Sequence, residues 1–290
     1  MKTILVTGAS GYLGSHLIKK ILERGDKVIA ILGRPEDLSN EFPTNDNIKV
    51  FPCADINNID LGHVDTLIHT AFSRGDNLEG LTSSITFTET IIDLVNTQDI
   101  DSIINISSQG VYKGLLPGQK VTENGTISPD TAYGLAKWAV ENMFKIGCQK
   151  QYTNIRMASL SANARFLSFF VNDVILQKKI TITAPNQFAS IMDVSDAVEG
   201  ILAIEKLPIS ERKTIYNLGP GTQYSILNYA ESANSIGKDY GFMPTKISIE
   251  DCGKNSAICM DCSRLELQTG WSCKISKDMM LNKLFTSIAY

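Results

Sequence analysis

The sequence lacks a long apolar run, an internal repeat, a low-complexity segment and a strong charge of either sign. No apolar stretch approaches the roughly 20 residues that a membrane-spanning helix needs. The formal net charge of −4 argues against a broad nucleic-acid-binding surface. The opening residues, MKTILVTGAS, enter a strand-like stretch at once, without the apolar region and cleavage site of an export signal. These absences predict a cytoplasmic protein that binds neither membranes nor nucleic acid.

Residues that could bind a metal are also few and poorly spaced. The three histidines, His16, His63 and His69, form no ligand pattern. The last four of the six cysteines are spaced C-x6-C-x2-C-x10-C. Structural zinc sites usually need two closely spaced ligand pairs, and only Cys259 and Cys262 form such a pair. Disulfides are not expected without an export signal. We therefore expect no metal site and reduced thiols.

The first half of the chain alternates short apolar runs with longer amphipathic ones. Helical patterns cover residues 15–25, 83–99 and 133–150, and 290 residues suffice for a full core. Strands that are apolar throughout and separated by helices predict a parallel sheet covered on both faces. The fold class predicted is α/β, a doubly wound nucleotide-binding sheet. Its strands are expected at residues 3–8, 27–32, 48–55, 64–72, 101–108 and 152–158.

Beyond about residue 160 the regular alternation ends. A helical pattern at 165–179 is followed by short strand-like and helical pieces. We predict a dinucleotide-binding domain over residues 1–160. Residues 161–290 are predicted to form a smaller mixed substrate-binding part, some of which returns to the sheet. The sequence leaves open whether the chain forms a homodimer.

A glycine-rich turn, TGASGYLG, joins the first strand to the first helix. Gly8 permits the tight bend, Gly11 lets the backbone approach a pyrophosphate, and Gly14 lets helix and sheet pack closely. The N–H groups at the start of the helix would bind the anion. This turn predicts a bound dinucleotide, contacted by the glycines and by the intervening Ser10, Tyr12 and Leu13.

A second pattern sets Tyr133 four residues before Lys137 in the stretch TAYGLAKWAV. Residues spaced i and i+4 share one helical face. Spacing alone is compatible with an ordinary surface pair. A catalytic interpretation requires a proton donor, and an adjacent ammonium would lower the pKa of Tyr133 from its usual value of about 10.

Together these motifs resemble the extended short-chain dehydrogenase/reductase family, in its NAD-dependent epimerase/dehydratase branch. The matching pieces run along nearly the whole chain: TGASGYLG, CAD at 53–55, HTAF at 69–72, SSQGVY at 107–112, YGLAK at 133–137, DVSDAVEGI at 193–201, YNLGPG at 216–221 and LQTGW at 267–271. A Tyr-x-x-x-Lys with a Ser-Ser pair 25 residues earlier is more specific than either piece alone.

The resemblance implies a catalytic set of Ser108, Tyr133 and Lys137. In this family the Tyr is the general acid and base, the Lys lowers its pKa and contacts the nicotinamide ribose, and the Ser hydrogen-bonds the substrate oxygen. Hydride transfer to a carbonyl builds negative charge on that oxygen, which such donors stabilise. Tyr133 and Lys137 would thereby also contact the cofactor. The other residues that the resemblance implies for the cofactor site are Ser107, Asp55, Ile56, Ala71 and Ser73. Structural roles would explain some of them equally well: a turn at the end of a strand for Ser107 and Ser108, and a helix cap for Asp55.

The sequence departs from the family where the adenosine ribose binds. NAD-binding members place an acid at the end of the second strand, and here Leu32 occupies that position, followed by Gly33 and Arg34. Without a carboxylate a 2′-phosphate is not repelled, and Arg34 could bind it. The sequence therefore favours NADP over NAD.

Other departures concern the substrate. Gln109 and Gly110 stand where 4,6-dehydratases carry an acid pair, Ser84 replaces a family Asn, and Ala189 replaces an Arg that often binds a nucleotide-sugar diphosphate. Ser159 and Arg165 remain as candidate substrate contacts.

The leading hypothesis is an NADP-linked oxidoreductase or epimerase acting on a keto or hydroxyl carbon of a small molecule, foremost a nucleotide-activated sugar. Two alternatives stay open: an NADPH-dependent carbonyl reductase of a small non-sugar substrate, and a non-catalytic dinucleotide sensor.

Overall fold

The computed structural model describes residues 1–33, 46–74, 77–112, 114–250, 252–253 and 257–289. They form two compact units. Unit 1 comprises Met1–Val111, Ile127–Arg156 and Val198–Tyr216, and unit 2 comprises Tyr112–Thr126, Met157–Ala197 and Asn217–Tyr290. The assignment of cofactor binding to residues 1–160 and of substrate binding to 161–290 stays a prediction.

A seven-stranded sheet organises unit 1, in the order β11-β6-β5-β4-β1-β2-β3. The pairs β1–β2, β2–β3, β1–β4 and β4–β5 are all parallel. The order reverses beside β1, and in such sheets ligands bind outside the carboxyl ends of the strands at this point. The structure confirms the predicted doubly wound sheet. Its strands are β1 (Thr3–Thr7), β2 (Lys27–Leu32), β3 (Ile48–Pro52), β4 (Thr66–His69), β5 (Ser102–Ser108), β6 (Gln151–Met157) and β11 (Ile215–Leu218).

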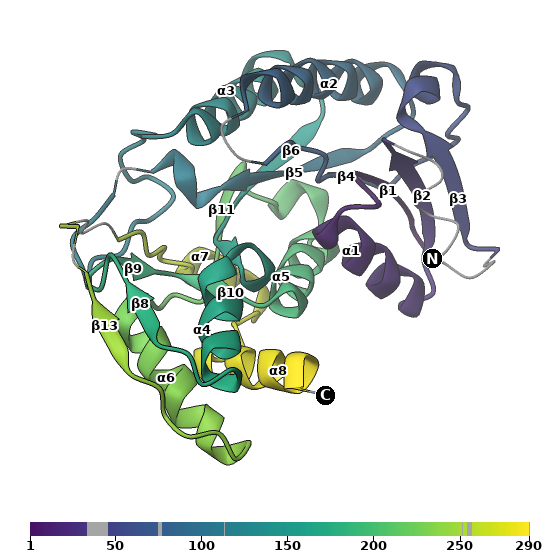
Figure 1. The fold of residues 1–290 in the computed structure, drawn as a ribbon. Helices are drawn as coiled ribbons and strands as arrows, with labels where there is room; N and C mark the ends of the chain where they lie inside the picture. Colours follow the sequence, from purple (N-terminus) through teal and green to yellow (C-terminus); the bar gives the residue numbers. More distant parts are fainter. Residues whose placement is uncertain (34–45, 75–76, 113, 251, 254–256, 290) are drawn as a thin grey trace. The chain divides into compact units, whose positions relative to one another are not determined.

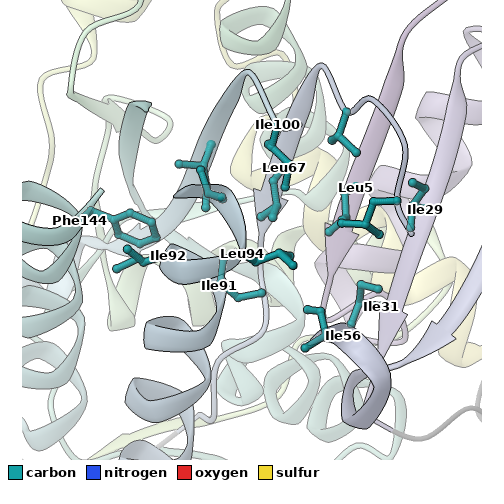
Figure 2. Packing of buried hydrophobic residues seen from close by; sticks show 14 of the residues in the cluster. Leu5, Ile29, Ile31, Ile56, Leu67, Ile91, Ile92, Leu94, Ile100 and Phe144 are labelled. Atoms are coloured by element: carbon teal, nitrogen blue, oxygen red, sulfur yellow. The ribbon is translucent and has the colours of Figure 1, made fainter. Parts of the chain in front are cut away.

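Helices cover both faces of this sheet. As Figure 1 shows, α2 (Leu78–Thr97) and α3 (Ala132–Gly147) lie on one face, and α1 (Tyr12–Glu23) and α5 (Val194–Lys206) on the other. Figure 2 shows the core beneath α2 and α3, where Leu5, Leu67 and Phe144 are fully buried. Strands covered on both faces must be apolar along their whole length, which explains the continuous apolar runs of the sequence.

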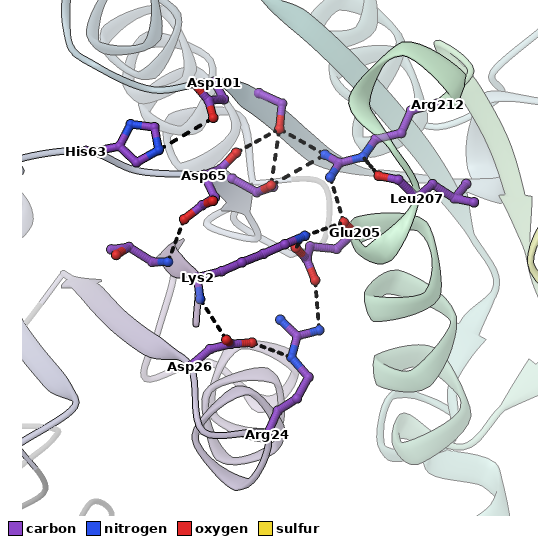
Figure 3. A network of polar contacts seen from close by, with 12 residues as sticks. Lys2, Arg24, Asp26, His63, Asp65, Asp101, Glu205, Leu207 and Arg212 are labelled. Carbon is purple, nitrogen blue, oxygen red and sulfur yellow. Dashed lines mark hydrogen bonds and ion pairs between the residues drawn. The ribbon is translucent and has the colours of Figure 1, made fainter.

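A polar network ties α5 to the amino-terminal end of β1 and to the end of α1 (Figure 3). The fully buried Glu205 accepts hydrogen bonds from Lys2 Nζ and Arg24 Nη1, both at 2.7 Å. The guanidinium of Arg212 donates to the backbone carbonyl of Glu205 at 2.6 Å. The buried carboxylate is therefore satisfied by two cations, as a buried charge must be.

Unit 2 is built around three helices, α4 (Arg165–Ile175), α6 (Ile226–Asp239) and α8 (Lys277–Ala289). Their apolar faces share one core, in which Val171, Tyr229 and Phe285 are buried. Three short strand pairs border it: β7 (Ser159–Leu160) with β10 (Ile191–Met192), β8 (Ile180–Ile182) with β13 (Ile247–Ile249), and β9 (Phe188–Ala189) with β12 (Tyr224–Ser225).

The chain also contains the 3₁₀ helices η2 (Cys53–Asn58) and η3 (Gln109–Val111) and the short helix α7 (Ser263–Thr269). Among the described residues, no helix has both the length and the apolar character required to span a membrane.

Candidate functional site

The glycine turn after β1 is closed so tightly that side chains would not fit. Gly8 has a φ of +68°, and a Cβ there would lie 2.7 Å from the backbone nitrogen of Ala71. A Cβ on Gly14 would lie 2.2 Å from the Gly8 carbonyl oxygen. Gly11 is the N-cap residue of α1. Because glycine has no side chain, this residue makes no side-chain hydrogen bond to the N–H groups of the first turn. This turn can bind an anion through backbone N–H groups.

The loop after β4 lies against this turn. Thr70 Oγ1 donates a hydrogen bond to the Thr7 carbonyl at 2.7 Å, which fixes the ends of β1 and β4 to each other. The next residues are positioned by α2, because the backbone N–H of Ser73 donates to Ser84 Oγ at 2.8 Å. Ser84 Oγ in turn donates to the Gly80 carbonyl. The serine that replaces the family's Asn thus supports the loop carrying Ala71 and Ser73.

Ser108 and Tyr133 are brought together where β5 ends and α3 begins. Their side chains are hydrogen-bonded to each other. Ser108 Oγ also accepts from the Gly110 N–H at 3.1 Å. The close approach of η3 and α3 requires a glycine at position 134, since a Cβ on Gly134 would lie 2.3 Å from the Gly110 carbonyl oxygen. Thr131 begins α3 by accepting a hydrogen bond from the Gly134 N–H, which sets the orientation of the Tyr133 turn.

Lys137 lies one turn further along α3 and is buried. Its ammonium donates a hydrogen bond to the Ile106 carbonyl at 2.8 Å. It lies 3.7 Å from the centre of the Phe72 ring and 5.8 Å from that of Tyr133. The Phe72 and Tyr133 rings meet edge to face, with centroids 6.0 Å apart. The predicted trio of Ser108, Tyr133 and Lys137 is therefore a single cluster within unit 1.

Burial dominates the electrostatics of this cluster. It raises the pKa of Tyr133, against the opposing effects of the Arg74 charge and the Ser108 hydrogen bond. Burial also lowers the pKa of Lys137 to about 7, against the opposing effect of the Glu141 carboxylate. The expectation that the pKa of Tyr133 is lowered is wrong for this structure, because the loss of hydration of the phenolate outweighs the nearby positive charge.

Ser107 points away from solvent into a second buried cluster. Its hydroxyl donates to Glu141 Oε1 at 2.5 Å, and the same carboxylate is bound by Arg156 through Nε at 3.0 Å and Nη2 at 2.7 Å. All three side chains are buried. The hydroxyl of Ser107 is thus engaged inside unit 1, and its predicted cofactor contact stays a prediction.

The remaining cofactor candidates of unit 1 differ in exposure. Asp55 is exposed in the first turn of η2, where its carboxylate is accessible. Tyr12 is 37% exposed at the start of α1. The side chains of Leu13 and Ile56 are buried in the core, so any contact they make with a cofactor would come from their backbone.

A group of possible metal ligands lies just before β4 and β5, at the amino-terminal ends of these strands. Ligand atoms of His63, Asp65 and Asp101 lie within 4.8 Å of one another. Asp65 already accepts the Thr3 N–H at 2.7 Å, and His63 Nδ1 lies 3.2 Å from an Asp99 oxygen. Exposed acidic groups of this kind are common without an ion. The expected absence of a metal stays a prediction.

Comparison with known proteins identifies the family. A family model described as "NAD dependent epimerase/dehydratase family" matches residues 4–219, which is more than half of the chain and includes the glycine turn and the Ser108–Tyr133–Lys137 cluster. The chain belongs to this family. The resemblance drawn from the sequence motifs is thereby confirmed.

Several enzymes that act on UDP-sugars, by their names, are similar to this chain. The UDP-glucose 4-epimerase of Halalkalibacterium halodurans is 25% identical over 310 aligned positions, covering 93% of this chain and 90% of that one. UDP-glucuronic acid decarboxylase 1 of Arabidopsis thaliana is 25% identical over 299 positions, covering 94% and 66%. The crystal structure of UDP-glucuronic acid 4-epimerase from Bacillus cereus, in complex with UDP-glucuronic acid and NAD, matches with a TM-score of 0.80 at 20% identity, covering 99% of both chains.

Of three further predicted residues, one is outside the described part of the chain and two belong to unit 2. Arg34, on which the preference for NADP depends, lies outside the described residues. Ser159 is exposed in β7 and Arg165 is exposed at the start of α4, both in unit 2. Their substrate contacts stay predictions.

Four residues around Ser108, Tyr133 and Lys137 were not predicted from the sequence: Phe72, Arg74, Glu141 and Arg156. Glu141 left a usable signal, because it follows Lys137 by four residues just as Lys137 follows Tyr133, so all three share one face of α3. Phe72, Arg74 and Arg156 come from other elements, and no spacing along the chain relates them to Lys137. Only the fold brings them there.

Proposed function

We propose that this chain is an NAD-dependent enzyme that oxidises and re-reduces a carbinol carbon of a nucleotide sugar, with Ser108, Tyr133 and Lys137 as its catalytic residues. The carrying observation is the hydrogen bond between Ser108 and Tyr133 beside the Lys137 ammonium, in the same unit as the glycine turn. A non-catalytic sensor would have no use for this cluster, whereas an oxidoreductase needs a proton acceptor at the reacting oxygen.

The glycine turn fits a dinucleotide. Gly8 and Gly14 leave no room for a Cβ, and the uncapped start of α1 offers N–H groups to a pyrophosphate. As to which dinucleotide, the family's description names NAD and the Bacillus cereus structure holds NAD. The preference for NADP has no support in these comparisons, so we propose NAD.

The residues of the cluster divide the chemistry between them. Bound NAD would take up a hydride from the substrate carbon and return it. In its phenolate form Tyr133 would take the proton of the substrate hydroxyl and become a phenol, and it would later return that proton to the carbonyl oxygen. Ser108 donates a hydrogen bond to that same oxygen and holds it near Tyr133. In its charged form Lys137 would stabilise this phenolate, against the effect of burial, which raises the pKa of Tyr133.

Support for a nucleotide sugar comes from the relatives and from unit 2. The relatives named above are UDP-sugar enzymes. Unit 2 contains a pocket of about 550 Å³ whose lining combines Phe166 and Phe170 with Lys179. The aromatic walls suit a base, and Lys179 could bind a phosphate, although Asp173 also lines this pocket. Ser159 and Arg165 stay candidate substrate contacts, with Arg165 as the cation for the diphosphate.

Incubation of the purified protein with NAD and UDP-glucose or UDP-glucuronic acid tests this proposal. Products are separated by anion-exchange chromatography while absorbance at 340 nm follows NADH. An isomeric UDP-sugar without net NADH identifies an epimerase, loss of carbon dioxide a decarboxylase, and net NADH a dehydrogenase. Absence of any conversion, together with reduction of small carbonyl compounds by NADPH, would replace the proposal with the carbonyl reductase.

A further inference from the structure

Glu141 lies one helical turn beyond Lys137 on α3. Tyr133, Lys137 and Glu141 are spaced i, i+4 and i+8, so they follow one another along one face of the helix. The carboxylate is 6% exposed and the Lys137 side chain is buried as well. Two opposite charges are thus held near each other in a poorly hydrated part of unit 1, where their interaction is stronger than at a surface.

The carboxylate is fixed from the sheet beneath it. Arg156 on β6 donates to Glu141 through Nε and Nη2, and Ser107 at the end of β5 donates through its hydroxyl. The residue after Ser107 is Ser108, which is hydrogen-bonded to Tyr133. Ser107 and Ser108 therefore share β5, and Glu141, Tyr133 and Lys137 share α3, while Arg156 joins from β6.

Of the other groups that the structure describes around Lys137, none supplies a compensating negative charge. Arg74 faces it as a like charge and acts to lower its pKa. His69 is buried and neutral near pH 7, with a pKa lowered to about 3 by burial and by Lys137. Tyr133 faces it through its ring. Among these groups, Glu141 is the one that favours the ammonium form.

We propose that Glu141, fixed by Arg156 and Ser107, is a positioning residue that keeps the neighbouring Lys137 in its charged form at the candidate site. The catalytic consequence rests on the proposed function of Lys137. The charge state of Lys137 does not rest on it, and it can be measured directly. With a pKa of about 7, Lys137 is poised so that a modest loss of stabilisation leaves it mostly neutral at physiological pH.

The test titrates Lys137 in the full chain labelled with ¹³Cε-lysine, the signal being assigned by its loss in Lys137→Met. Glu141→Gln keeps the size of the side chain and removes its charge. We expect the titration midpoint of Lys137 to fall by about one pH unit or more in this variant. Glu141→Asp, which keeps the charge, should lower the midpoint less, and it serves as the second variant if Glu141→Gln does not fold.

The matched control is Glu205→Gln, which removes another buried, doubly paired carboxylate of unit 1. It should lower the thermal stability as Glu141→Gln does while leaving the Lys137 midpoint in place. A Lys137 midpoint unchanged in Glu141→Gln, or lowered equally in Glu141→Asp, overturns the inference.

The pH profile of turnover separates the two proposals. A fall of the alkaline limb of kcat/KM in step with the Lys137 midpoint supports both. If the Lys137 midpoint falls and the pH profile of kcat/KM does not change, Glu141 still keeps Lys137 charged. Lys137 then has no part in the proposed mechanism.

Discussion

The ammonium of Lys137 lies 3.7 Å from the centre of the Phe72 ring, over its face. A cation in this position is stabilised by the ring by about 0.5–2 kcal/mol. Phe72 also packs against the main core of unit 1. The Phe72 side chain therefore has two opposing effects on Lys137. It excludes water, which disfavours the charged form, and its ring face attracts the cation, which favours the charged form.

Phe72→Leu separates these two effects, because leucine keeps the site apolar and removes the ring. We expect the Lys137 midpoint, followed by lysine NMR, to fall by about 0.4–1.5 pH units, which is the loss of the ring interaction expressed as a pKa change. Phe51→Leu makes the same exchange at another residue packed on this core and should leave the midpoint in place. A rise of the midpoint in Phe72→Leu would show that exclusion of water is the larger effect.

Lys137→Met should stabilise the protein at neutral pH. The native pKa of about 7 lies below the ordinary value of 10.5, so between these values the unfolded chain binds a proton that the native protein does not. Wild-type stability therefore rises with pH across this window, by about 1.4 kcal/mol per pH unit. Denaturant unfolding should show the variant to be the more stable at pH 7, with the difference shrinking toward pH 10. The exposed Lys20→Met should show no such convergence with wild type.

His69 should make the protein sensitive to acid. It is buried between Thr7 Oγ1, 2.7 Å from Nδ1, and Thr88 Oγ1, 3.1 Å from Nε2. Its pKa is lowered from 6.5 to about 3, so below pH 6.5 the unfolded chain gains a proton that the native protein refuses. Stability contributed by the neutral imidazole is lost as the pH falls through this range, at about 1.4 kcal/mol per pH unit.

His69→Gln removes this titration. Its unfolding free energy should therefore vary less than that of the wild type between pH 7.5 and pH 5. The exposed His16→Gln is the matched exchange and should follow the wild-type curve. Parallel curves for wild type and His69→Gln would show that His69 does not set the acid sensitivity.

Gly14→Ala should abolish dinucleotide binding. The added Cβ would lie 2.2 Å from the Gly8 carbonyl oxygen, a contact that only a shift of the backbone at the start of α1 can relieve. Dissociation constants for NAD, measured by calorimetry, should rise by at least tenfold, because the N–H groups of the turn would be displaced. Gly114→Ala adds the same methyl group in open space and should leave affinity unchanged. Wild-type affinity in Gly14→Ala would place the dinucleotide elsewhere.

The fold could be predicted because its signals are local, and the Ser108–Tyr133–Lys137 cluster because its motifs resemble those of a known family. The glycine turn between strand and helix, and the four-residue step from Tyr133 to Lys137, fix positions relative to elements that the same sequence dictates. The direction of the Tyr133 pKa could not be predicted in this way. It depends on how deeply the phenol is buried and on Arg74, which another loop brings near it.

The same distinction explains Ser107. As a strand-end serine next to Ser108, it looked in the sequence like a residue facing the cofactor. In the structure its hydroxyl donates to Glu141, a contact that no spacing along the chain indicates, and its contact with the cofactor stays a prediction. The partner that decides its orientation stands 34 positions away in the sequence.

The most direct test of the proposed mechanism compares turnover of a UDP-sugar by wild type, Tyr133→Phe and Tyr112→Phe, with NAD affinity measured in parallel. Both variants remove one phenolic oxygen, and that of the buried Tyr112 donates to Asn217 Oδ1 at 2.6 Å within unit 2. We predict that Tyr133→Phe lowers kcat about 10²–10⁴-fold with NAD affinity retained, whereas Tyr112→Phe loses stability and keeps turnover. Turnover by Tyr133→Phe within threefold of wild type would contradict the account.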